Sequence, residues 1–306
     1  NNFLASVYFG ANTGESFLDV STGEFLTAQG SMAYVSKLLQ NFRPSEVLIE
    51  KQKRQQFSTA FGDNFNTFYL EDWVFHQDYT NESLCQHFKT KSLKGFGVDG
   101  LPNGLIASGA ILHYLGETQH HKLQHITSIE RLLEADFVWM DKFTIRNLEL
   151  YHSNNSNAVT LIQVIDKTLS PMGGRLLKRW LALPLKSVVA IKARHDVVQY
   201  FYDNETALME IQSSLKGIGD LERLISKVAT AKVSPREVVQ LKNSLEQILP
   251  IKALALDCDH LHLNSLGEQI QDCEALRLKI KATLNEDAPV NILKGHTIAS
   301  SANEEL

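Results

Sequence analysis

Cysteine is scarce in this 306-residue chain, and long apolar runs are missing. The three cysteines, Cys85, Cys258 and Cys273, are odd in number and show no C-x-x-C spacing. That pattern argues against a disulfide framework or a cysteine-rich zinc site and favours a reducing compartment. No run approaches the roughly 18 apolar residues of a membrane span. The N-terminus has no basic segment ahead of an apolar one, so a signal peptide is not predicted. We therefore expect a cytoplasmic protein with no membrane partner.

An excess of positive charge is also lacking, because the formal net charge is −5. This argues against a chain whose whole surface grips a phosphate backbone, which requires a basic face. A local basic stripe on the helices predicted near residue 180 remains possible. We interpret it as the solvated face of two helices, because it lacks interleaved exposed aromatics and nucleic-acid footprints are usually denser. The stripe comprises Arg175, Lys178, Arg179, Lys186, Lys192 and Arg194.

No stretch supplies the phosphate-binding loop G-x-x-x-x-G-K-[ST], whose backbone amides and lysine cradle a nucleotide. Gly109 and Gly116 are too far apart, and Glu117 follows where lysine is needed. No nucleophile and base can be paired from the sequence. We predict that this chain is not itself an enzyme, with no catalytic or cofactor-binding residue.

Metal ligands are not predicted either. His120, His121 and His125 lie in the polar stretch 117–125, which we interpret as a solvated linker, because zinc sites recruit cysteines or carboxylates at fixed spacing. His260 and His262 alternate in the sequence HLHL and would share one face of a strand, where a surface pair is the expectation. No metal site is therefore assigned.

The residues that are present predict two regions. Up to about residue 120, apolar strands alternate with helices, which is typical of an α/β domain. Turn residues separate the first three strands, so we expect an antiparallel meander. Ser31 is positioned to cap a helix that runs to about Gln40. The predicted strands are 3–9, 15–20, 24–28, 47–49 and 65–70, and a second helix is predicted over 105–115.

From about residue 121 to 306 the pattern is helical. Ser170 followed by Pro171 predicts a capped helix whose apolar stripe, Leu176, Leu177, Trp180, Leu181 and Leu183, is buried. Ser187 and Ser234 predict further capped helices. The remaining expectations are helices over 220–228 and 235–249, a single long helix over 263–284, and a short strand pair within 290–300 that turns at Lys294-Gly295.

Four stretches carry a resemblance to a known family. They are Phe96–Asp99 (FGVD), Arg146–Leu150 (RNLEL), Ser170–Leu181 (SPMGGRLLKRWL) and Ile298–Leu306 (IASSANEEL). Together they resemble, in order, the MutS family of DNA mismatch-repair ATPases. The resemblance implies α/β plus all-α architecture: a ribonuclease H-like connector domain over residues 1–120, then the first part of a helical core, or lever, domain over 121–306.

The resemblance also implies function. A MutS-like protein binds mismatched double-stranded DNA as a homodimer and hydrolyses ATP with magnesium, through domains that we do not expect in this chain. The family's Phe-x-Glu mismatch wedge has no counterpart here, where the nearest pattern is Phe17-Leu18-Asp19. The chain lacks an initiator methionine, so we expect a piece of a longer protein. Its implied roles are to couple the ATPase to the DNA clamp and to offer a docking surface to a MutL-type partner, for which Asp78–Phe88 is the candidate segment.

Two alternatives stay open. A ribonuclease H-like nuclease with a helical appendage would need converging carboxylates; Asp19 and Glu50 lie near strand ends, whereas strand 3–9 carries none. A MutS-like recombination protein is the other alternative.

In the family, the core chain returns to the core after the clamp. Because we do not expect that returning helix in this chain, we expect an uncovered apolar stripe on the last helix, which could drive dimerisation. The stripe comprises Leu266, Ile270, Leu276 and Ile280.

Overall fold

The computed structural model describes residues 2–118, 123–153, 155, 157–300 and 302. It divides into an α/β unit, Asn1–Ile165 with Arg179–Lys186, and a helical unit, Asp166–Lys178 with Ser187–Leu306. The limits expected from the sequence, 1–120 and 121–306, divide the chain differently, because the α/β unit continues well past residue 120. The boundary residues 120 and 121 themselves lie outside the described part of the chain.

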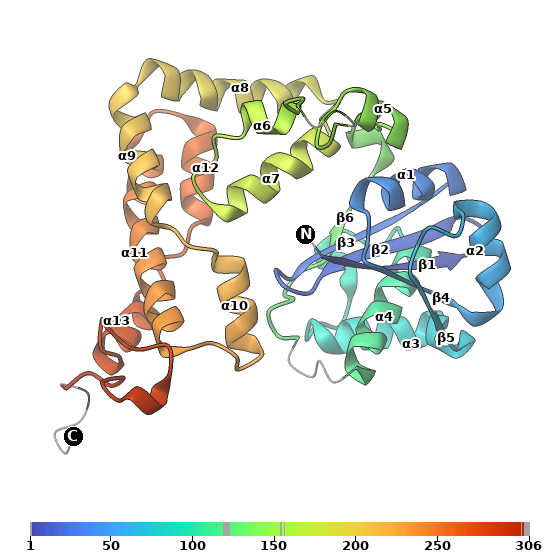
Figure 1. The fold of residues 1–306 in the computed structure, drawn as a ribbon, viewed down its shortest axis with the longest axis horizontal. Coiled ribbons are helices and arrows are strands. Elements are labelled where there is room, and N and C mark those ends of the chain that lie inside the picture. The colour runs from blue at the N-terminus through green and yellow to red at the C-terminus, as the bar shows by residue number, and fades with distance from the viewer. Residues whose placement is uncertain (1, 119–122, 154, 156, 301, 303–306) are drawn as a thin grey trace. The chain divides into compact units, whose positions relative to one another are not determined.

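The α/β unit is built on a mixed sheet (Figure 1) with strand order β5-β4-β1-β2-β3-β6. The three-stranded antiparallel meander expected from the sequence is confirmed, since β1 pairs with β2 and β2 with β3. β4 lies parallel to β1, and β5 lies parallel to β4. The strands are β1 Phe3–Phe9, β2 Thr13–Asp19, β3 Glu24–Gly30, β4 Glu46–Glu50, β5 Thr67–Leu70 and β6 Glu130–Arg131.

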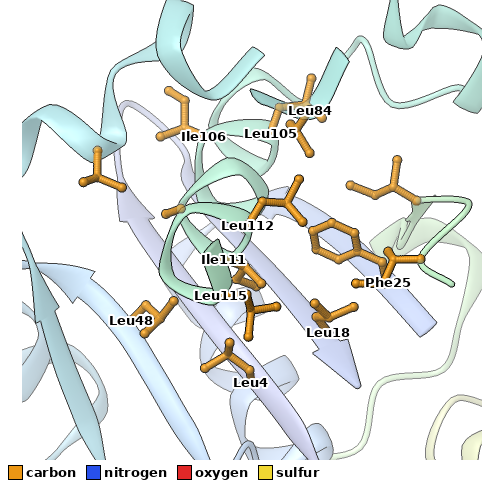
Figure 2. Close-up of a cluster of buried hydrophobic side chains, with 14 of the residues drawn as sticks. Leu4, Leu18, Phe25, Leu48, Leu84, Leu105, Ile106, Ile111, Leu112 and Leu115 are labelled. Atoms are coloured by element: carbon orange, nitrogen blue, oxygen red, sulfur yellow. The ribbon is translucent and has the colours of Figure 1, made fainter. Parts of the chain in front are cut away.

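Helices cover both faces of this sheet. The α/β unit contains α1 Met32–Phe42, α2 Arg54–Phe61, α3 Gln77–His87, α4 Pro102–Glu117, α5 Lys142–Asn147 and α6 Leu161–Ile165, with short 3-10 turns η1 Lys51–Lys53, η2 Asp72–Phe75, η3 Leu93–Phe96 and η4 Glu134–Asp136. Alternate residues of the strands point to opposite faces, so Leu4 and Leu18 pack against α4, whereas Phe3 and Phe17 pack on the side of α1. Figure 2 shows the first of these clusters, with Ile111 and Leu115 of α4 over the strands.

Glycine allows α4 to lie very close to the sheet. A Cβ on Gly14 of β2 would stand 2.0 Å from the carbonyl oxygen of Asn103. A Cβ on Gly104 of α4 would stand 2.6 Å from the Thr27 hydroxyl. Since no side-chain rotation can relieve a clash with backbone, Gly14 sets how deeply α4 seats on β2. The buried hydroxyls of Ser108 and Ser16 then meet at 3.0 Å across the same contact.

The segment after α4 completes the sheet. β6 pairs in parallel with β3, and the ladder continues because the Leu132 amide donates to Thr27 O at 2.8 Å. The Tyr34 hydroxyl of α1 donates to Leu132 O at 3.1 Å. The stretch that follows α7 also belongs to the α/β unit, since Pro184 O accepts a hydrogen bond from the Val138 amide.

The helical unit follows the predicted cap chemistry. The Ser170 side chain accepts from Gly173 N and the Ser187 side chain from Ala190 N. Ser234 forms a reciprocal capping box with Glu237, so two backbone N–H groups at the start of α11 that have no partner within the helix are hydrogen-bonded. The helices are α7 Pro171–Ala182, α8 Val188–Asp203, α9 Glu205–Gly217, α10 Leu221–Ala229, α11 Pro235–Asp257, α12 Leu261–Gln269 and α13 Glu274–Thr283, followed by the turn η5 Ile292–Lys294. The last turn of α7, from Arg179, belongs to the α/β unit.

Three predictions for this unit are wrong. α11 continues past Pro250 to Asp257; the buried Ala255 beyond the proline packs on Gly267 of α12, and such packing offsets the cost of an interior proline. The single helix predicted over 263–284 is two helices, because the chain leaves the helical conformation and reaches φ +48° at Cys273. The region 290–300 contains the turn η5 and one bridge, Leu284 to Ile298, in place of a strand pair.

Candidate functional site

The two carboxylates considered for a nuclease do not converge. Asp19 pairs with Phe3 at the start of β1, whereas Glu50 follows Ile49, which pairs with Val7. About five strand residues, roughly 17 Å along β1, therefore separate them. Asp19 accepts hydrogen bonds from the Ser21 amide and hydroxyl at the adjoining turn. Burial, and then the Asp72 carboxylate, raises the pKa of Glu50. This pair cannot hold two metal ions about 4 Å apart.

The histidines are structural where the structure describes them. His125 is buried, and its Nε2 lies 2.8 Å from Val20 O, so the expected solvated linker is wrong at this residue. His120 and His121 lie outside the described residues. His260 is not in a strand; it caps α12, and its Nδ1 accepts from Leu263 N. Within the described ranges, no three histidine, cysteine, aspartate or glutamate side chains gather closely enough to hold a metal ion.

The predicted basic stripe is largely committed to contacts within each unit. Arg175 makes a two-pronged ion pair with Asp220, at 2.7 Å for both bonds, and also pairs with Glu222. Hydrogen bonding to Asp220, above all, raises the pKa of Arg175. In the α/β unit, Arg179 pairs with Glu24 and with Glu130.

The other basic side chains differ in their surroundings. Lys186 donates to Glu134 O at 3.5 Å. Burial lowers the pKa of Arg194, whereas Lys192 is exposed. The basic stripe is therefore not the uniformly solvated face that the sequence predicts.

The orientation of α7 corrects the prediction for Trp180. The side chains of Leu176 and Trp180 are 45% and 42% exposed, and only Leu183, just beyond the helix, is buried among the predicted stripe. Arg175 and Arg179, one turn apart, face protein carboxylates instead. Hydrophobic periodicity identifies an apolar face, but whether that face is covered depends on residues far away in sequence.

The last-helix stripe is exposed only in part. Leu266 of α12 and Leu276 of α13 are exposed, as predicted, but Ile270 is half-buried and Ile280 is buried. The break between α12 and α13 ends the common face that one continuous helix would have presented.

Helix α3 offers a firmly held polar surface. Its inner face is buried through Thr80 and Leu84. A Cβ on Gly109 of α4 would stand 2.4 Å from Thr80 Cβ, so the two helices touch through backbone and small side chains. The outer face, hereafter the α3 face, is exposed and consists of Asp78, Glu82 and Gln86 at helical spacing. This is the segment expected to meet a partner.

Beside α3 lies an aromatic cluster that sequence reasoning missed. The ring centroids of Trp73 lie 5.1 Å from those of both Tyr79 and His113, edge to face. The Tyr79 hydroxyl lies 2.8 Å from His113 Nδ1. Burial lowers the pKa of His113, opposed by the nearby Glu117 carboxylate, and raises the pKa of Tyr79. Trp73 nevertheless remains 54% exposed. We call Trp73, Tyr79, His113 and Glu117 the indole patch.

A buried carboxyl was also missed. Glu15 of β2 has no exposed surface, and neither of its oxygens has a hydrogen-bond partner among the described residues. Burial raises the pKa of Glu15 well above 4.5. The signal in the sequence was a charged residue between Gly14 and Ser16 in an otherwise buried strand.

The helical unit contains an open surface hollow. It has a volume of about 680 Å³ and lies between the α8–α9 junction and the end of α11. Tyr200, Pro250 and Cys258 line it together with four acidic residues, Asp203, Glu205, Glu210 and Asp257. These acids do not form a metal-binding group. None of the helices described is both long enough and apolar enough to span a bilayer.

Comparisons with known proteins agree with the resemblance seen in the sequence. Residues 2–127 match the family model "MutS domain II", and residues 143–305 match "MutS domain III". Proteins named "DNA mismatch repair protein MutS" from Flavobacterium psychrophilum and Flavobacterium johnsoniae are 61% and 62% identical over the whole of this chain. The protein of that name from Bacteroides thetaiotaomicron is 53% identical. The chain covers 36%, 35% and 36% of these three relatives.

Proposed function

The chain belongs to the MutS family of DNA mismatch repair proteins, with domains II and III of that family, and from this premise we propose its role in the whole protein. It couples ATP hydrolysis to the grip on mismatched double-stranded DNA, and its α/β unit docks a MutL-type partner. A homodimer, a cytoplasmic location and the use of ATP with magnesium are part of the same proposal.

We further propose that the α/β unit is a ribonuclease H-like connector whose sheet is completed by β6, beyond the limit near residue 120 expected from the sequence. The sheet order β5-β4-β1-β2-β3, with a meander followed by parallel strands, supports this arrangement. The separation of Asp19 from Glu50 supports a connector that does not cleave nucleic acid. The names of the relatives favour repair over recombination.

The nucleotide cannot be placed on this chain. No stretch fits the phosphate-binding loop, and the described residues include no cluster of three potential metal ligands. We therefore assign no step of ATP hydrolysis to these residues.

The observation that carries the coupling role is a series of ion pairs that tie successive parts of the helical unit. Arg175 of α7 pairs with Asp220, which caps α10. Lys227 of α10 pairs with Glu237 of α11. Lys252 of α11 pairs with Asp272, just ahead of α13, at 2.6 Å. A partly buried, two-pronged pair such as Arg175–Asp220 is the geometry in which an ion pair fixes orientation.

The test uses the whole protein with Arg175→Ala. We expect ATP hydrolysis without DNA to persist, while ATP-triggered release of mismatched duplex slows by about 2- to 30-fold, as expected when coupling falls by about 0.5–2 kcal/mol. Lys192→Ala, which removes an exposed basic side chain, is the matched control. Release at the wild-type rate in Arg175→Ala would show that this junction does not transmit the signal.

The observation that carries the docking role is the α3 face, which is exposed while its helix is fixed on α4. Reversing a charge at the centre of an interface commonly costs several kcal/mol. We therefore expect Glu82→Lys to weaken binding of a MutL-type protein at least tenfold, measured by biolayer interferometry. Glu205→Lys, on the helical unit, serves as the charge-matched control. Unchanged affinity in Glu82→Lys would place the partner elsewhere.

A further inference from the structure

We propose that the indole patch binds an arginine side chain of the protein that docks on the α3 face. The inference rests on the proposed docking function and adds the chemistry of the contact. The patch adjoins α3, because Trp73 precedes the helix by one turn and Tyr79 lies in its first turn.

The charge of the surroundings favours a cation. Residues 71–79 and 113–117, which form the patch and its margins, contain four carboxylates and no lysine or arginine of their own. Lys51 of η1 pairs with one of them, Glu71, at 3.0 Å, so the negative charge rests mainly on Asp72, Asp78 and Glu117. Glu117 lies one helical turn after His113 on α4 and acts electrostatically on both Tyr79 and His113. Burial lowers the pKa of His113, which disfavours a competing positive charge on the imidazole. A basic side chain therefore meets attraction here from several directions.

The geometry favours arginine in particular. The rings of Tyr79 and His113 stand at 71° and 78° to the Trp73 indole and hold it in place, while 54% of Trp73 remains open. A planar guanidinium can stack on an open indole and still donate hydrogen bonds in its own plane. Glu117 supplies a carboxylate acceptor at the rim of the same cluster.

A second aromatic pair is held between α4 and β5. Phe68 of the edge strand β5 is 42% exposed, and its ring lies 4.9 Å from that of Tyr114. The Tyr114 hydroxyl donates to Glu46 at 2.8 Å. Tyr114 follows His113 on α4, so this pair is attached to the same helix as the indole patch. Exposed tryptophan and tyrosine that are fixed by their neighbours are typical anchors of protein interfaces.

The first experiment titrates the 306-residue chain with a tetra-arginine peptide at low salt in a calorimeter, and with tetra-citrulline, which has the same shape without the charge. A cation over an exposed aromatic ring contributes about 0.5–1 kcal/mol. We therefore expect Trp73→Ala to bind tetra-arginine about two- to fivefold more weakly, and Glu117→Gln to weaken binding as well. Tyr202→Ala, which removes an aromatic that is 82% exposed on α8, is the matched control and should bind as wild type. Equal affinity of wild type and Trp73→Ala for tetra-arginine, or equal binding of both peptides by wild type, overturns the inference.

The second experiment measures the same variants, with Glu82→Lys, against a MutL-type protein. If wild type does not bind that protein, the docking function fails, and the peptide titration still decides the nature of the indole patch. If Glu82→Lys abolishes binding while Trp73→Ala leaves it unchanged, docking stands and the indole patch is not part of it. Weakening in both variants supports the inference.

Discussion

Replacing Gly14 by alanine should destabilise the α/β unit by about 1–3.5 kcal/mol. The added Cβ would lie 2.0 Å from Asn103 O and 2.6 Å from Gly104 N, both backbone atoms of α4. Overpacking of this kind typically costs about 1–3 kcal/mol. The displaced helix end also strains the 2.7 Å bond from Asn103 N to the Gln29 side chain, which contributes about 1 kcal/mol. Alanine also lowers the conformational entropy of the unfolded chain, which offsets about 0.4–1 kcal/mol of this destabilisation.

Fluorescence offers a reading of this unit alone. All three tryptophans, Trp73, Trp139 and Trp180, belong to the α/β unit. Urea unfolding followed by tryptophan emission therefore reports on it even though the two units need not unfold together. With an m-value of about 2 kcal/mol/M, the midpoint of Gly14→Ala should fall by about 0.5–1.8 M.

The matched control lies in the same helix. A Cβ added to Gly116 of α4 would have no atom within 4 Å outside its own helix turn. Alanine is favoured over glycine in helices by about 0.8–1 kcal/mol. Gly116→Ala should therefore raise the midpoint or leave it unchanged. Midpoints for Gly14→Ala and Gly116→Ala that agree within error would refute the claim that α4 seats directly on the backbone of β2.

Three further variants test other features. Burial raises the pKa of Glu15 above 4.5, so the folded state binds this proton more tightly than the unfolded state, and stability should fall as pH rises above that value. Glu15→Gln should flatten this fall, and urea midpoints that change with pH in parallel for both proteins would contradict it. Trp180→Ala should cost about 1 kcal/mol or less, well below the roughly 3–5 kcal/mol of a core tryptophan, given its 42% exposure; a loss of several degrees in Tm would show that the indole is buried. Ser234→Ala, which removes the cap of α11, should cost the helical unit about 1 kcal/mol by circular dichroism, whereas Ser265→Ala, inside α12, should have a smaller effect.

The features predicted well from sequence are those decided within one turn of chain. Ser31, Ser170, Ser187 and Ser234 each cap the helix that follows, because a side-chain oxygen reaches an amide two or three residues on. The meander was also predictable, since turn residues separate three apolar strands. The MutS membership rested on motif residues and is confirmed by the comparisons.

The features that were missed depend on distant residues. The exposed side of α7 was predicted as buried, because an apolar stripe says nothing about what covers it. The indole patch joins η2, α3 and α4, and no local pattern links Trp73 to His113. The break before α13 requires a positive φ at Cys273, a residue type that gives no warning of it. Glu15 was overlooked because strand periodicity does not identify which charged residue enters a core.

The pairing of β6 with β3 has a practical consequence for dividing this chain. A shortened polypeptide that stops near residue 120 would lose Glu130–Arg131 and the Leu132 amide bond to Thr27. The last strand of the meander would then carry an open row of amide and carbonyl groups along one side. An exposed strand edge of this kind can form backbone hydrogen bonds with a strand of another copy, which leads to aggregation. A soluble first domain should therefore be expressed with the chain extended beyond Leu132.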